Sequence, residues 1–378
     1  MFFSFRPAEE LKPDDVCAFL FAGTGSTGVP DLLSAARWGP AAARAVADVL
    51  DAAQEGLPPR WPSLRTILLD DPSHYRAAVR VPGVAQLCGY AASVAVDRAL
   101  RTAGIQPAHA VGQSFGEIAA LVCAGAFGVA DGARMATGLV EVLARRGAGG
   151  GMGLLEAGED GTRDCIRAAG APQVVVACLN APSVTVVSGP AGPLEAVLAA
   201  AARRGVRAVR LAVPYLSHHP AMAGADQEWY EMIRGFPQRT LEVRVHSPVR
   251  GGAYTDADDL HRALADCIVR PVRLPEALRA VHAAGATVFT EAGPGSALCE
   301  CARLSVPGAR TLAPLRSRSR QTAAGREPSG TSGRVAHHAP GGLPGDAHGD
   351  ALAAPGPGKS AAGIAPDSDR EQEDHDGH

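Results

Sequence analysis

The pentapeptide Gly112-Gln113-Ser114-Phe115-Gly116 constrains the fold more than any other stretch of this chain. It follows a strand-compatible run from Ala108 to Val111 and precedes a helix-compatible run from Glu117 to Ala124. A serine in a G-x-S-x-G sequence between a strand and a helix lies on a sharp turn that exposes its hydroxyl. The sequence therefore predicts a nucleophile suited to acyl transfer. A tight structural turn is the alternative, because 44 glycines make the pattern easy to reach by chance.

The composition is that of a globular chain with a sizeable core, since 46% of its 378 residues are hydrophobic. The net charge is −3 and no basic face stands out, which argues against nucleic acid and membrane surfaces as partners. The eight cysteines are scattered without C-x-x-C spacing, as expected for reduced thiols. No apolar run approaches the ~20 residues of a membrane span. Met1 to Arg6 lacks a signal-peptide pattern, so we expect a cytoplasmic location.

The composition changes at about Ser317, where aromatic residues vanish and Gly, Pro, Ala, Ser and Asp dominate. Such a segment buries too little apolar surface to offset its ordering entropy, so residues 317–378 are expected to form a disordered tail. Its five histidines could bind metal adventitiously, but we favour a solvated tail and predict no metal site. They are His337, His338, His348, His375 and His378.

The ordered part, residues 15–315, alternates short β-rich runs with alanine-rich helical runs. This alternation predicts an α/β fold, namely a large α/β-hydrolase-like domain with a parallel sheet. Its strand candidates are Val16 to Phe21, the run ending in Ala110-Val111, and Val288 to Glu291.

A tighter rhythm between Gly151 and Val213 predicts an inserted subdomain of ferredoxin-like βαββαβ order. The expected elements are a strand at Met152 to Leu155, a helix at Asp160 to Ala169, strands at Val174 to Leu179 and Val184 to Val187, a helix at Leu194 to Arg204 and a strand at Ala208 to Val213. We therefore divide the chain into a large domain (1–145 and 214–316), the insert (146–213) and the tail (317–378). A substrate cleft is expected between the two bodies.

Ser114 needs a base, and two adjacent histidines follow the last strand of the insert in the loop Pro214 to Met222. This loop returns to the large domain over the mouth of the expected cleft. An imidazole with a pKa near 7 suits general-base work. Spacing alone leaves open whether His218 or His219 points inward.

Further short motifs follow one another along the chain. They are Phe21-Ala22-Gly23-Thr24-Gly25-Ser26-Thr27, Gly112 to Glu117, Leu121 to Gly125, Asn180-Ala181-Pro182 with Val186 to Gly189, Ser217 to Met222, Arg270 to Arg273 and Glu291 to Gly295. In this order they resemble the motifs of the malonyl-CoA:acyl-carrier-protein transacylase family and of its polyketide-synthase acyltransferase relatives, including the discrete enzymes of the type II polyketide kind. The resemblance spans about residues 16 to 315.

The resemblance implies a role for each matching residue. Ser114 would be the nucleophile and His218, rather than His219, the base, with the backbone carbonyl of Arg273 orienting the ring of His218 in a dyad without a carboxylate. The N–H groups of Phe115 and Thr24 would form the oxyanion hole, although the family usually has glutamine at the position of Thr24. Glu117 is expected to stabilise the start of its helix.

Three departures from the family pattern concern the acyl pocket. Malonyl-selective members carry an arginine, five positions beyond the equivalent of Arg134, that pairs with the substrate carboxylate, and this chain has Leu139 there. Losing such a pair weakens carboxylate binding by roughly 2–4 kcal/mol, on the order of a hundredfold. Arg134, Arg145 or Arg146 could substitute if the helix is shifted. Gln113 stands where the family has histidine. The bulk of Phe115 should restrict the pocket to short acyl groups, unless Phe115 simply packs against the insert.

The resemblance implies an acyltransferase that moves an acyl group between coenzyme A and acyl carrier protein through an acyl-Ser114 ester. The departure at Leu139 favours a short starter without a carboxylate. Three alternatives remain: a thioesterase that edits acetyl-primed carrier protein, a malonyl-CoA:acyl-carrier-protein transacylase, and a non-catalytic homologue that binds carrier protein. Acyl-CoA and phosphopantetheinyl carrier protein would be substrates, with no permanently bound cofactor and with a ketosynthase as a further partner.

Overall fold

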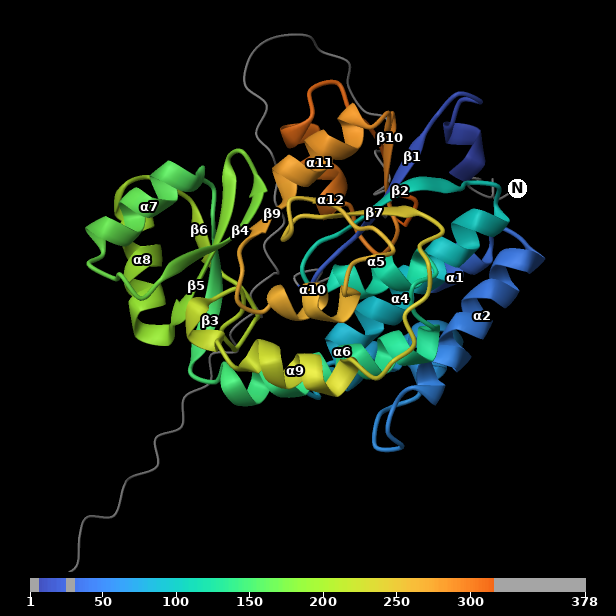
Figure 1. Ribbon diagram of the computed structural model, residues 1–378, viewed down its shortest axis with the longest axis horizontal. Helices are drawn as coiled ribbons and strands as arrows, with labels where there is room; N and C mark the ends of the chain where they lie inside the picture. Colours follow the sequence, from blue (N-terminus) through green and yellow to red (C-terminus); the bar gives the residue numbers. More distant parts are fainter. Residues whose placement is uncertain (1–6, 25–30, 316–378) are drawn as a thin grey trace, which may run out of the picture. The chain divides into compact units, whose positions relative to one another are not determined.

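The computed structural model describes residues 7–24 and 31–315. The predicted tail, 317–378, lies outside the described residues. Figure 1 shows two sheets with helices around them. The first sheet is built from segments far apart in the sequence, and the second mainly from the middle of the chain.

The six-stranded sheet has the strand order β11-β10-β1-β2-β7-β8. All its pairings are parallel except that between β7 and β8. The strands are β1 (Cys17–Phe21), β2 (Pro107–Gly112), β7 (Arg244–Ser247), β8 (Gly252–Ala253), β10 (Val288–Glu291) and β11 (Arg310–Leu312). The predicted strands at β1, β2 and β10 are confirmed, whereas β7, β8 and β11 were not predicted.

Successive side chains of β1 enter different parts of the core because they point to opposite faces of the sheet. Ala18 and Leu20 pack with residues of α11 (Leu274–Ala283) and α12 (Ala297–Ser305). Phe19 and Phe21 face the larger core. All five residues of β1 are buried, as expected for a parallel strand covered by helices on both faces.

The helices of the larger core surround the segment that carries Ser114. The main ones are α2 (Pro40–Glu55), α4 (Val84–Thr102), α5 (Gly116–Cys123) and α6 (Val129–Arg146). The other helices are α1 (Leu32–Ala36), α3 (Tyr75–Ala78), α9 (Ala225–Ile233), α10 (Leu260–Asp266) and the short turns η1 (Pro7–Glu10), η2 (Thr66–Asp70), η3 (Pro72–His74) and η4 (Pro220–Met222).

The five-stranded sheet has the order β6-β3-β5-β4-β9. Its elements are β3 (Gly150–Leu155), α7 (Glu159–Ala168), β4 (Val175–Ala181), β5 (Val184–Pro190), α8 (Ala191–Arg203), β6 (Ala208–Arg210) and β9 (Val272–Arg273). The first six follow one another as strand, helix, strand, strand, helix, strand, and α7 and α8 lie against this sheet (Figure 1).

Two details of this sheet differ from the sequence-based expectation. The strand expected to reach Val213 ends at Arg210. In addition, β9 joins the sheet from a part of the chain assigned to the large domain, and it pairs in parallel with β4. The described residues group into one compact unit. The division at residues 146 and 213 therefore stays a prediction.

Candidate active site

Ser114 lies on a strained corner between β2 and α5. Its φ of 56° is in the left-handed region, which costs energy for a residue with a side chain and is characteristic of functional positions. The corner packs directly on the end of β1, where the N–H of Gln113 donates to the carbonyl of Phe21 at 2.9 Å. A Cβ atom at Gly116 would collide with the same carbonyl, so only glycine fits there. The predicted strand, turn and helix around Ser114 are confirmed.

His218 lies beside Ser114, although 104 positions separate the two in the sequence. The Ser114 hydroxyl is 2.7 Å from Nε2 of His218, whose Nδ1 is 3.2 Å from the backbone carbonyl of Arg270. Because a carbonyl can only accept, Nδ1 carries the proton and donates it, which leaves Nε2 free to accept from the serine. This is the arrangement that a general base requires.

Burial sets the protonation state of His218, which is only 3% exposed. Desolvation of the charged ring lowers its pKa to about 4, and the carbonyls of Arg270 and Cys267 partly oppose this shift. The thiol of Cys267 is 3.9 Å from Nδ1, and burial raises the pKa of that thiol. At neutral pH the imidazole is therefore uncharged and able to take the serine proton.

The carbonyl that orients His218 belongs to Arg270, so the expectation of Arg273 is wrong. The chain turns after α10, where the N–H of Arg270 donates to the carbonyl of Asp266 at 3.0 Å. This turn aims the Arg270 carbonyl at the imidazole. Three residues later Arg273 has joined β9, opposite Leu179, and its side chain is 3.4 Å from a carboxylate oxygen of Glu159.

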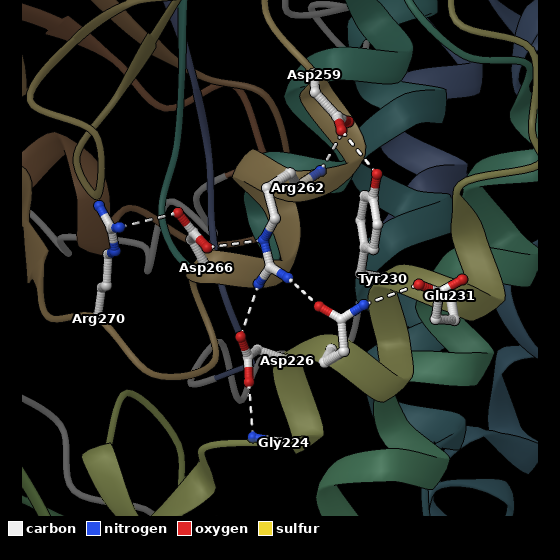
Figure 2. Close-up of polar contacts among 9 residues, drawn as sticks. Gly224, Asp226, Tyr230, Glu231, Asp259, Arg262, Asp266 and Arg270 are labelled. Atoms are coloured by element: carbon white, nitrogen blue, oxygen red, sulfur yellow. Dashed lines mark hydrogen bonds and ion pairs between the residues drawn. The ribbon is translucent and has the colours of Figure 1, made fainter.

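A polar network holds the helix that leads into this turn (Figure 2). Arg262 of α10 donates to Asp226 of α9 at 2.8 Å and to Asp266 at 2.9 Å. Asp266 in turn is 3.3 Å from the guanidinium of Arg270. Tyr230 of α9 donates to Asp259, the N-cap of α10, at 3.0 Å. These contacts tie the turn that carries the Arg270 carbonyl to α9 and α10.

Thr24 and Phe115, the predicted oxyanion-hole residues, line the same cavity as Ser114 and His218. The loop that carries Thr24 approaches the serine corner closely, because a Cβ atom at Gly23 would lie 2.7 Å from the carbonyl of Gln113. Phe115 immediately precedes the first residue of α5, where backbone N–H groups have no helical acceptor. Donation from these two N–H groups to a reacting oxygen stays a prediction.

The cavity beside Ser114 is small and mainly apolar. Its volume is about 20 Å³, enough for roughly one water-sized group. The side chains that line it are Thr24, Ser114, Phe115, Ile118, Leu139, Leu143, Tyr215, Ser217, His218, Trp229, Leu264, Cys267 and Ile268. Among these described residues none is an arginine, a lysine or a carboxylate.

The three arginines considered as replacements for the missing pocket arginine lie elsewhere. Arg134 forms an ion pair with Asp131 at 2.8 Å, and Arg145 and Arg146 both bind Glu228. All three side chains are about half exposed. The structure therefore places none of them among the residues that line the cavity.

Gln113 does not line the cavity, which corrects its expected place among the acyl-pocket residues. Its amide instead donates to Oδ1 of Asn180 in β4 at 2.6 Å. The Gln113 amide binds Asn180 because this residue offers a hydrogen-bond acceptor beside the corner. Gln113 thus links the corner that carries Ser114 to the second sheet.

Glu117 is the second residue of α5, but burial prevents the charged role expected for it. The residue is 0% exposed, and desolvation raises its pKa to about 8. The hydroxyls of Ser247 and Tyr254 oppose this shift, although neither carboxyl oxygen of Glu117 has a partner within normal hydrogen-bonding distance. Glu117 is therefore mainly neutral at pH 7 and does not stabilise the helix as an anion.

A second, wider hollow of about 410 Å³ also borders His218. It lies between the α7 and β4 segments and the loops that carry His218 and Arg270. Its lining residues are Arg163, Ile166, Arg167, Pro172, Val174, Val175, Val176, His218, Pro220, Val269 and Pro271. His218 thus borders both the small cavity and this groove, whose lining includes two arginines.

Two kinds of feature are absent from residues 7–24 and 31–315. No cluster of three or more His, Cys, Asp or Glu side chains there could hold a metal ion. No helix in the same ranges combines the length and hydropathy that crossing a membrane requires.

Several residues of the site had no clear signal in the sequence. The Arg270 carbonyl is a main-chain group, so its role depends on the turn rather than on a residue type. Trp229 comes from α9, a segment that only the fold brings to Ser114. Leu143 could have been anticipated, because it lies one helical turn beyond Leu139 on α6.

Comparisons with known proteins identify the family of this chain. Residues 40–316 match the family model described as the acyl transferase domain. The chain therefore belongs to the acyl transferase domain family. It is 36% identical over 249 residues to the spectinabilin polyketide synthase system protein NorA' of Streptomyces orinoci, a match that covers 65% of this chain and 7% of that protein.

Two solved structures illustrate the shared fold. The malonyl-CoA:acyl carrier protein transacylase of Xanthomonas oryzae pv. oryzae is 28% identical with a TM-score of 0.70, over 79% of this chain and 94% of that one. The acyltransferase domain from module 8 of the salinomycin polyketide synthase is 30% identical with a TM-score of 0.68, over 80% and 71% of the two chains. The chain thus corresponds to a small part of a polyketide synthase protein and to nearly all of a transacylase.

Proposed function

We propose that this chain transfers an acyl group between coenzyme A and acyl carrier protein through an acyl ester of Ser114. The observation that carries the proposal is the 2.7 Å contact between the Ser114 hydroxyl and Nε2 of His218. The 3.2 Å contact between Nδ1 and the Arg270 carbonyl fixes the tautomer that makes this contact productive. A serine and a neutral imidazole in this geometry are suited to nucleophilic catalysis.

The reaction has two half-reactions of the same kind. In the first, Ser114 attacks the thioester carbonyl while Nε2 of His218 takes the hydroxyl proton, and the N–H groups of Phe115 and Thr24 receive the developing negative charge. The carbon–sulfur bond breaks, the proton passes to the thiolate, and coenzyme A leaves. In the second, a phosphopantetheine thiol gives its proton to His218 and attacks the ester. The bond between the carbonyl carbon and Oγ breaks, and His218 returns the proton to Oγ of Ser114.

The lining of the cavity supports a short acyl group without a carboxylate. Leu139 and Phe115 bring apolar surface to the cavity, and its volume of about 20 Å³ suits a group as small as the methyl of an acetyl unit. A free carboxylate there would lose its hydration without gaining a cationic partner. The transacylase of Xanthomonas oryzae is named for malonyl-CoA, so malonyl transfer is the rival proposal, favoured by similarity rather than by the cavity.

The groove beside His218 is the proposed path of the thioester arm. It reaches the imidazole from the segment 146–213, which we propose acts as a ferredoxin-like subdomain over the site. Arg163 and Arg167 of α7 border it and are about half exposed or more. A phosphate at the end of a pantetheine arm would find two guanidinium groups there. The matched polyketide synthase protein suggests a ketosynthase in the same pathway.

A transfer experiment tests the proposal. Purified chain is mixed with labelled acetyl-CoA and holo acyl carrier protein, and label on the carrier protein is counted against free acetate. The proposal predicts label on the carrier protein, dependent on Ser114. Release as free acetate alone would instead establish a thioesterase, and an absence of both products would contradict acetyl transfer.

A further inference from the structure

His219, the second imidazole of the adjacent pair, is fully engaged in hydrogen bonds. Its Nδ1 is 3.0 Å from the N–H of Ala221, and its Nε2 is 3.0 Å from the carbonyl of Gln173. Because an N–H can only donate, Nδ1 accepts and the single ring proton lies on Nε2, where it donates to the Gln173 carbonyl. The residue is 6% exposed. It therefore has neither a free nitrogen nor the solvent access of a second base.

The backbone of His218 needs support from its surroundings. Its φ of 53° is in the left-handed region, which a residue with a bulky side chain occupies only when neighbouring contacts hold it there. Immediately before it, the N–H of Ser217 is 3.3 Å from the Ser188 hydroxyl in β5. Immediately after it, His219 returns to an extended backbone with φ −130° and ψ 131°.

His219 joins three segments that meet around the catalytic imidazole. Its ring caps the short helix η4 through Ala221, and the same ring binds the Gln173 carbonyl just before β4. Its backbone N–H donates to the carbonyl of Ile268 at 3.2 Å. Ile268 belongs to the turn whose Arg270 carbonyl orients His218.

The turn that contains Ile268 is also held by side-chain contacts of Asp266. Asp266, at the end of α10, binds both Arg262 and Arg270, as Figure 2 shows. His219 therefore connects a segment already anchored on α9 and α10 to the strained residue that precedes it in the chain. A shift at His219 would move the imidazole of His218 relative to both Ser114 and the Arg270 carbonyl.

We propose that His219 is a positioning residue that holds the backbone and ring of His218 in register with Ser114. It acts through three bonds: from Ala221 to its ring, from its ring to Gln173, and from its N–H to Ile268. The inference rests on the proposed function, in which His218 is the base. It gives a role to His219, a residue that the reaction proposed for Ser114 and His218 does not use.

Two conservative variants separate the roles of the two ring nitrogens. In His219→Asn the amide oxygen can replace Nδ1 as the cap acceptor for Ala221 but does not reach Gln173. In His219→Gln the longer amide can donate to the Gln173 carbonyl but leaves the Ala221 N–H without its cap. His219→Ala removes both contacts. Val197→Ala, in the core around α8 and away from Ser114, is a matched control for loss of packing stability.

The readout is the rate at which a fluorophosphonate labels Ser114, followed by intact mass. Oγ of Ser114 forms a bond to phosphorus, the phosphorus–fluorine bond breaks, fluoride leaves, and the hydroxyl proton passes to Nε2 of His218. This probe reports the activated serine and does not depend on which acyl group the protein uses. Rates are measured from pH 5 to 9, with thermal unfolding recorded for each variant.

If His219 positions His218, the fluorophosphonate should label Ser114 at least about tenfold more slowly in His219→Ala than in the unaltered protein. The Asn and Gln variants should fall between it and the unaltered protein, and Val197→Ala should stay within about twofold of the unaltered protein. In His219→Ala the acid limb of the pH profile should move to higher pH, because a displaced His218 ring is better solvated. If His219→Ala does not fold, the Asn and Gln variants carry the test. Folded variants with unaltered rates and pH profiles would overturn the inference.

The proposed function can fail separately. If Ser114 is labelled by the fluorophosphonate but takes no acyl group from any acyl-CoA, the transfer proposal fails and the His219 variants still decide the positioning role. If the unaltered protein is not labelled at Ser114 at any pH, both conclusions are overturned, because His218 is then not an effective base.

Discussion

The amide of Gln113, the residue before Ser114, donates to Oδ1 of Asn180 in the second sheet at 2.6 Å. This contact joins the turn after β2 to β4 and is partly buried. A hydrogen bond of this kind contributes about 0.5–1.5 kcal/mol to stability. The residue next to Ser114 thus links the two sheets on either side of the site.

A double-mutant cycle measures that link. We expect Gln113→Ala and Asn180→Ala each to lower the free energy of unfolding, with a coupling energy of about 0.5–1.5 kcal/mol between them. Urea unfolding of the two single variants and the double variant gives this value. Fully additive effects would show that the contact does not contribute to stability in solution.

Leu139 is the proposed determinant against carboxylated substrates. In Leu139→Arg a guanidinium would replace apolar surface in the cavity, so the ratio of malonyl to acetyl loading on Ser114 should rise by about tenfold or more. Intact mass after incubation with an equal mixture of the two coenzyme A esters gives the ratio. Leu139→Met, which keeps the cavity apolar, should leave it unchanged. An unaltered ratio in a folded Leu139→Arg protein would remove Leu139 from the account of selectivity.

The pKa of His218 predicts an unusual pH profile. Burial lowers this pKa to about 4, so the base stays unprotonated well below the ordinary histidine pKa of about 6.5. The rate of Ser114 acylation should therefore change little as the pH falls from 8 to about 5. Single-turnover acylation at each pH measures this limb directly. A limb centred near pH 6.5 would indicate a solvated imidazole.

The lowered pKa of His218 also makes the free energy of unfolding depend on pH. Between about pH 6.5 and pH 4 the unfolded chain binds a proton at His218 that the folded protein does not. This residue therefore makes the free energy of unfolding fall as the pH drops through that window. Acylation rates must be compared at pH values where unfolding measurements show that the chain is folded.

Glu117 should make the protein less stable as the pH rises toward 8. Its folded pKa of about 8 lies above the ordinary value of 4.5, so the folded state holds a proton that the unfolded state has released between these values. The free energy of unfolding then decreases as the pH rises from 4.5 to 8. Glu117→Gln removes this ionisation and should stabilise the protein at pH 8 by roughly 1–3 kcal/mol, with little difference near pH 5.

Urea unfolding at pH 5 and pH 8 tests the Glu117 prediction. The matched control for replacing a carboxylate by an amide is Glu141→Gln, at a side chain that is 42% exposed in its ion pair with Arg60. The prediction is wrong if the unaltered protein and Glu117→Gln lose stability equally between the two pH values.

The sequence predicted the parts of the site that depend on residue type and local pattern. Ser114 was predictable because glycines, a strand and a helix around a serine allow few conformations. The Arg270 carbonyl was not, because main-chain groups have no signature and a turn of a few residues shifts which carbonyl faces the ring. The burial of Glu117 could not be read from its position in the first turn of a helix, since burial depends on segments far away in the sequence, among them those that carry Ser247 and Tyr254.

Acyl transfer through Ser114 is tested most directly by the intact mass of the protein after incubation with acetyl-CoA, propionyl-CoA and malonyl-CoA together. One acyl group, mainly acetyl or propionyl, is expected on Ser114, and it should be lost in Ser114→Ala and strongly reduced in His218→Ala. An adduct that persists in Cys267→Ser would exclude the neighbouring thiol as its site. Predominant malonylation would contradict the proposed selectivity, and an adduct that persists in Ser114→Ala would contradict the mechanism.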